Sequence, residues 1–73
     1  MNTSELFGKE VLDMNAKNIG KVTDIDFDLH KGSINHILIK AGINKKIFID
    51  VGKIDKVGDK VILTISKDEV TKS

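Results

Sequence analysis

The side chains best suited to chemistry in this sequence are three aspartates, Asp24, Asp26 and Asp28, which alternate with large apolar residues. Carboxylates are ligands that Ca²⁺ and Mg²⁺ prefer, at metal–oxygen distances of ~2.0–2.6 Å. In an extended strand these positions share one face, but they lie ~7 Å apart because each residue advances the strand by ~3.4 Å. We therefore interpret the row as the solvent face of a half-buried strand and predict no metal site, leaving only weak divalent-cation binding open.

The two histidines are the next candidates for chemistry. His30 falls in a predicted turn, whereas His36 lies in the apolar run 34–41, on the face opposite Ile37 and Ile39. His36 could pair across the sheet with an aspartate, and the strand register decides with which one. No serine or threonine stands in a recognisable arrangement with a histidine and an acid, so a hydrolytic triad has no support. The stretch 52–58 lacks the Gly-Lys-Ser/Thr ending of a phosphate-binding loop. The sequence therefore predicts no enzyme: no catalytic residue and no cofactor.

Composition narrows the possible partners. All 12 basic residues are lysines, and 11 acidic residues leave a net charge of +1 on 73 residues. So small a net charge does not favour binding to nucleic acid or to an acidic membrane surface. Without arginine, no side chain can form the bidentate hydrogen bonds that recognise guanine or phosphate. The absence of cysteine excludes disulfides and thiolate zinc sites and suits a reducing cytosol. No apolar run approaches the ~20 residues of a membrane span. We expect a cytoplasmic protein with no membrane insertion and no nucleic-acid partner.

The elements that must position these residues are dominated by one long β-hairpin over residues 19–41. Its first arm alternates apolar residues with aspartates over residues 25–29, its second arm is apolar on nearly every residue, and Gly32 can provide the positive φ of the reversal. Val22 is even-numbered, whereas Ile25 and Phe27 are odd-numbered. Either Val22 faces outward, or a bulge near Thr23 and Asp24 shifts the register. We favour the bulge.

For the rest of the chain, the sequence predicts short strands separated by glycine-containing turns. Strands are expected at 9–13, 46–50 and 61–65, a helical turn at 4–8, and a helical turn or irregular edge at 52–58. The sequence predicts an all-β fold: a six-stranded, antiparallel, strongly bent barrel over residues 1–65 with a polar, frayed tail over 66–73. Ser66 and Glu69 have capping-box spacing, but no apolar run follows them. The expected core is Val11, Ile25, Phe27, Ile37, Ile39, Ile47, Ile49, Val61, Leu63 and Ile65.

Four short motifs can be compared with known families: SELFGKEVLD at 4–13, IGKVTDI at 19–25, GSI at 32–34 and VGDKVI at 57–62. The first three resemble the PRC-barrel family, and the last is similar to the closing strand of that family. The resemblance runs from Ser4 to about Ile65 and implies the family's small barrel, here in a small standalone prokaryotic member of the archaeal kind. Ala16 stands where the family usually has glycine, so Asn15 or another residue is expected to carry any left-handed conformation in that turn. Gly52 stands where the family often has proline.

The resemblance also guides the functional expectation. Barrels of this family occur in the photosynthetic reaction-centre H subunit, in a ribosome maturation factor and in small standalone proteins, some linked to assembly roles. The resemblance therefore implies a non-enzymatic adaptor or assembly module that binds itself or a protein partner. The alternative is an RNA- or ribosome-associated module, by analogy with the ribosome maturation factor.

Apolar residues on the solvent-facing sides of the predicted strands suggest where a partner would bind. If odd-numbered positions point inward, four apolar residues point outward, namely Leu12, Leu38, Phe48 and Ile62. The second hairpin arm is apolar on both faces, whereas an ordinary solvent-facing strand alternates. We predict a homodimer or a hetero-complex with Leu38 and Phe48 near its centre. In the alternative, Leu6, Phe7, Ile54 and Val57 cover these residues within one monomer.

Overall fold

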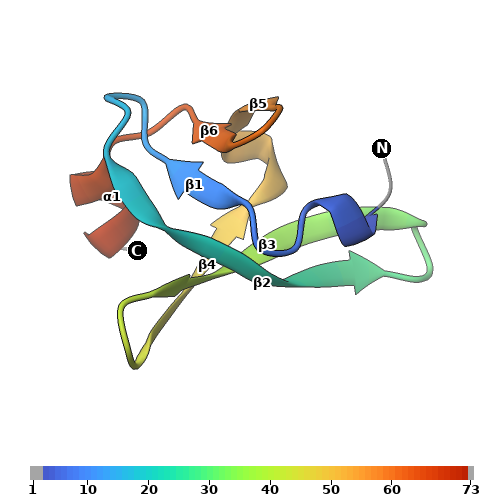
Figure 1. The fold of residues 1–73 in the computed structure, drawn as a ribbon. Coiled ribbons are helices and arrows are strands. Elements are labelled where there is room, and N and C mark those ends of the chain that lie inside the picture. The colour runs from blue at the N-terminus through green and yellow to red at the C-terminus, as the bar shows by residue number, and fades with distance from the viewer. Residues whose placement is uncertain (1–2, 73) are drawn as a thin grey trace.

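The computed structural model describes residues 3–72, and strands dominate it (Figure 1). Three short helices accompany the strands. In chain order the elements are η1 (Thr3–Glu5), β1 (Glu10–Leu12), β2 (Asn18–Asp28), β3 (Ser33–Ala41), β4 (Lys45–Asp50), η2 (Val51–Lys53), β5 (Ile54–Val57), β6 (Val61–Leu63) and α1 (Lys67–Lys72).

The six strands form one bent, mixed sheet in the order β4-β3-β2-β1-β6-β5. All neighbouring strands are antiparallel except β1 and β6, which pair in parallel. The prediction of a fully antiparallel, closed barrel was therefore wrong on both points. The chain crosses from β4 through η2 and β5 to the other half of the sheet, and such a crossover is what allows β6 to run parallel to β1. Within residues 3–72 no strand pairing joins the edge strands β4 and β5.

Strand β2 belongs to both halves of the sheet and bends between them. It pairs with β1 up to Lys21 and with β3 from Lys21 onward. Opposite Ile39 and Leu38 of β3, the register moves from Val22 directly to Asp24, so Thr23 is the extra residue of a bulge. Val22 is 1% exposed. The predicted bulge is confirmed, and it explains why Val22 faces the core despite its even number.

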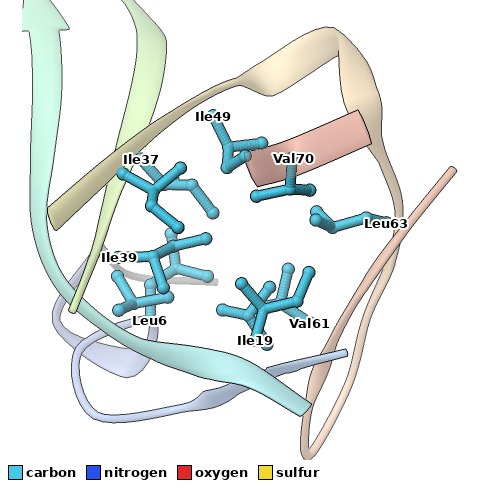
Figure 2. Close-up of a cluster of buried hydrophobic side chains, with 11 residues drawn as sticks. Leu6, Ile19, Ile37, Ile39, Ile49, Val61, Leu63 and Val70 are labelled. Atoms are coloured by element: carbon cyan, nitrogen blue, oxygen red, sulfur yellow. The ribbon is translucent and has the colours of Figure 1, made fainter. Parts of the chain in front are cut away.

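The buried apolar side chains line the inner face of the bent sheet (Figure 2). Seven residues of the expected core are buried as predicted: Val11, Ile37, Ile39, Ile47, Ile49, Val61 and Leu63. Ile25 and Ile65 are partly buried against them. Phe27 was predicted wrongly, since it is 47% exposed. It lies near the end of the β2–β3 hairpin, which extends beyond β1 (Figure 1). Leu6, Ile19, Val22 and Val70 complete the core.

The last part of the described chain is helical, in contrast to the frayed tail expected for residues 66–73. Residues 67–72 form α1, and Val70 is 1% exposed. Its side chain lies between Ile49 of β4 and Leu63 of β6, which come from opposite halves of the sheet (Figure 2). The hydroxyl of Ser66 accepts a hydrogen bond from the Glu69 amide at 3.3 Å. The capping spacing was thus a real helix signal, and one apolar residue is enough because α1 is also anchored through Asp13.

Asp13 is a buried carboxylate that ties the β1–β2 turn to α1. Its Oδ1 accepts hydrogen bonds from the amides of Asn15 and Lys17, each at 2.8 Å, and its Oδ2 accepts one from the Lys67 amide at 2.7 Å. The tight turn needs a left-handed residue, and Ala16 itself has φ 64°. The expectation that Asn15 or another residue would carry this conformation in place of Ala16 was wrong.

Candidate protein-interaction surface

The three strands β2, β3 and β4 present one side to the core and the other, here called the outer face, away from it. The centre of the outer face is a rung in which Asp24, Leu38 and Phe48 lie side by side on successive strands. Leu38 is half-buried, whereas Phe48 is 62% exposed. Alternation explains the exposure, because the neighbours Ile47 and Ile49 point inward to the core. The rung therefore puts an aromatic ring and an aliphatic side chain at the surface.

On one side of this centre, the next rung is Asp26, His36 and Asp50, here called the acidic row. His36 Nδ1 lies 3.0 Å from Asp26 Oδ2, and the His36 and Phe48 ring centroids are 6.1 Å apart. Asp50 Oδ1 accepts a hydrogen bond from the Gly52 amide at 2.8 Å and so caps η2. The predicted pairing of His36 with a cross-strand aspartate is confirmed, and the aspartate is Asp26.

On the other side of the centre, the neighbouring rung is Lys21, Lys40 and Lys46, here called the basic row. All three side chains are exposed. Read along the strands, the outer face thus changes from basic, through apolar, to acidic. Apart from Asp24 in the central rung, its charges are segregated at two ends.

A shallow hollow of about 250 Å³ lies over the centre of the outer face. This volume is below the ~300–1,000 Å³ of ordinary small-molecule sites. The hollow suits a side chain of another protein better than a cofactor. Its lining residues are Asp24, Ile25, Asp26, His36, Leu38 and Phe48.

The four residues predicted to form an interface fall into two separate pairs. Leu38 and Phe48 are cross-strand neighbours on β3 and β4, whereas Leu12 and Ile62 are neighbours on β1 and β6. The pairs lie far apart, because Leu12 shares a rung with Asn18 and Leu38 shares one with Asp24. Six residues of β2 span roughly 20 Å. Leu12 and Ile62 are half-buried, so the outer face centres on Leu38 and Phe48.

The aspartate row of β2 divides into three separate interactions. Asp24 Oδ1 accepts a hydrogen bond from the Ile25 amide at 2.8 Å, and Asp26 pairs with His36. Asp28 Oδ1 accepts the amides of His30 and Lys31 in the β2–β3 turn. Among residues 3–72, no three acidic or histidine side chains are grouped closely enough to hold a metal ion.

Sequence reasoning missed the basic row. Lys21, Lys40 and Lys46 are far apart in the chain, and only the strand register brings them into one rung. Asp50 was missed for the same reason. The alternation of charge and apolar residues on β4 was the available signal: Lys46, Phe48 and Asp50 occupy successive positions on one face.

The comparisons with known proteins agree with the architecture. The model of the PRC-barrel domain family matches residues 1–70, and the chain belongs to this family. A search of curated proteins found no match. Within the described residues, no helix has the length and apolar character that crossing a membrane would require.

Proposed function

We propose that this chain is a non-enzymatic protein-interaction module and that the outer face of β2, β3 and β4 is its docking surface. The observation that carries the proposal is the exposure of Phe48 beside Leu38, between the basic and acidic rows. Aromatic residues dominate the energetics of protein interfaces when a partner removes them from water, and a charged rim gives such a contact its specificity.

The proposal describes an adaptor for assembly rather than a catalyst. The hollow beside Phe48 is small, and its titratable residues lie on an open surface. A cytoplasmic location and an archaeal source are part of the same proposal. They rest on the absence of cysteine and on the family resemblance.

A pull-down from native lysate tests the docking surface. We expect wild-type protein to capture partners that the Phe48→Lys variant loses. Leu29→Lys is the matched control, because Leu29 is 84% exposed but lies in the β2–β3 turn, outside the outer face. Circular dichroism should show both variants folded. Captured proteins that remain bound to Phe48→Lys would contradict the proposal, and enrichment of ribosomal proteins would favour the RNA- or ribosome-associated alternative.

A further inference from the structure

We infer that the partner of the outer face is a second copy of this chain, docked face to face with its strands antiparallel to those of the first. The inference rests on the proposed function, because it names an occupant for the same surface. It is carried by the segregation of charge on that surface. Lys21, Lys40 and Lys46 lie one rung from Leu38 and Phe48 on one side, and Asp26, His36 and Asp50 lie one rung away on the other.

A twofold axis lying along the central rung makes this surface complementary to itself. Such an axis reverses the strand direction but keeps each strand opposite its own counterpart. The basic row of each copy then lies over the acidic row of the other. On β4, Lys46 of one copy faces Asp50 of the second copy, and on β2, Lys21 faces Asp26 of the second copy. Every such contact occurs twice.

The charges also select against the other face-to-face arrangement. A twofold axis along the strands would place the basic row over the basic row and the acidic row over the acidic row. Like charges brought together at an interface disfavour association. The antiparallel arrangement avoids this repulsion between rows, and face-to-face sheets usually pack with their strand directions within about 30° of each other.

The central rung of Asp24, Leu38 and Phe48 lies on the axis in this arrangement, so Asp24 faces Asp24 of the second copy at one end of the rung. Phe48 and Leu38 of one copy contact the same residues of the other, which removes the most exposed ring of the outer face from water. The aliphatic stems of the lysines extend the apolar contact outward. Because the net charge of each copy is only +1, long-range repulsion between copies is weak.

The size of the face sets the strength of association. Three strands ~4.8 Å apart, with about five residues each at ~3.4 Å, give a face of roughly 14 by 17 Å. This flat area, roughly 240 Å² per copy, is well below the ~800 Å² per partner of a standard interface, so association is weak and transient. We therefore expect a dissociation constant of about 0.1 to 1 mM, visible by sedimentation between about 10 µM and 1 mM.

Charge reversal with mixing of two variants tests the arrangement. The basic-row variant carries Lys21→Glu and Lys46→Glu. The acidic-row variant carries Asp26→Lys and Asp50→Asn, because asparagine keeps a capping acceptor for the Gly52 amide. Each variant alone opposes rows of like charge and should dissociate at least tenfold more readily than wild type. In an equimolar mixture three of the four facing pairs on β2 and β4 join opposite charges, and the fourth joins a glutamate to an asparagine, so a heterodimer should form.

The outcomes separate this inference from the proposed function. A wild type that stays monomeric throughout the concentration range overturns the inference, as do variants that dimerise as well as wild type, or folded monomeric variants that fail to associate when mixed. If wild type is monomeric yet loses its lysate partners on Phe48→Lys substitution, the docking surface stands and only the second copy is excluded. Phe48→Lys should otherwise give a folded monomer, verified by circular dichroism.

Discussion

At the scale of single residues, Asp13 connects the most distant parts of the chain. Burial of its carboxyl acts to raise the pKa, but hydrogen bonds from the amides of Lys17, Lys67 and Asn15, helped by the Lys17 charge, outweigh burial and hold the pKa below its ordinary value. A carboxylate with a lowered pKa stabilises the fold at pH values above its unfolded pKa of ~3.9. That contribution is lost as the pH falls through the folded pKa.

Asp13→Asn should therefore lower the free energy of unfolding at pH 7, and the difference from wild type should shrink as the pH falls below about 4. In the wild type, three backbone amides donate hydrogen bonds to the two carboxylate oxygens of Asp13, whereas asparagine has only one side-chain oxygen that can accept them. Urea unfolding across this pH range gives the measurement, with the exposed Asp55→Asn as control. A difference that stays constant with pH would show that the Asp13 charge contributes nothing.

Gly20 lies where two strands approach too closely for a side chain. A Cβ at this position would lie 2.2 Å from the Lys40 carbonyl oxygen and 2.8 Å from Ile39 Cγ2. Since the first contact is with backbone, Gly20→Ala should force the bend of β2 to open and destabilise the protein by about 3 kcal/mol. Gly58→Ala is the matched control, because nothing lies within 4 Å of its Cβ position. Chemical denaturation that shows equal stability for the two variants would contradict the close approach.

Ala16 occupies a backbone conformation that favours glycine. With φ 64°, its Cβ is held against the local backbone, and Ala16→Gly should stabilise the protein by ~1 kcal/mol. The neighbouring Asn15→Gly should instead destabilise it, because Asn15 has no positive φ and glycine only adds freedom to the unfolded chain. Thermal unfolding of both variants decides the point. No gain for Ala16→Gly would mean that the turn relieves the strain elsewhere.

Residue-level features were predictable where their cause is local. The Val22 bulge follows from a break in parity within one strand, and the His36–Asp26 pair follows from two arms of one hairpin. Asp13 was not predictable, because its partner Lys67 is 54 residues away. No pattern in the sequence relates those two positions.

At the scale of elements, α1 packs between the two halves of the sheet through a single buried side chain, that of Val70. Val70→Ala removes two buried methyl groups between Ile49 and Leu63, and it should destabilise the protein by about 2 kcal/mol. Val51→Ala is the control, since Val51 of η2 is 40% exposed. Equal stability of the two variants in urea would mean that α1 is not docked in solution.

The strands were easier to predict than this helix, for a physical reason. Period-2 alternation on residues such as Ile47 and Ile49 marks a strand without any knowledge of its partners. The segment 66–73 contains one large apolar residue, Val70, so it has no helical periodicity. Its structure depends on contacts with Asp13 and the core, which sequence reasoning could not place.

At the scale of the whole molecule, the sheet is open, and its edge strand β4 is protected from pairing with other chains by charged residues rather than by closure into a barrel. Lys45 and Lys46 occupy the edge strand β4, and charged edge residues discourage pairing with other chains. The helix α1 fills the space where β4 and β6 diverge. The number of strands and the all-β class can be predicted from sequence patterns. The parallel pairing of β1 with β6 joins segments far apart in the chain, and the positions of the glycines do not predict it.

The charge arrangement of the whole molecule leads to a last prediction: no measurable binding to single-stranded RNA at about 150 mM salt and micromolar protein. The basic row is one rung of lysines, and the ring exposed beside it, Phe48, shares its own rung with Asp24. Phosphates that followed the strands from the lysines towards that ring would meet the acidic row next, whereas single-strand binding needs stacking rings along a continuous basic groove. Fluorescence anisotropy with a labelled oligonucleotide measures this directly, with the acidic-row variant Asp26→Lys and Asp50→Asn as a more basic comparison. Wild-type binding that weakens as salt is raised would contradict the prediction and favour the RNA-associated alternative.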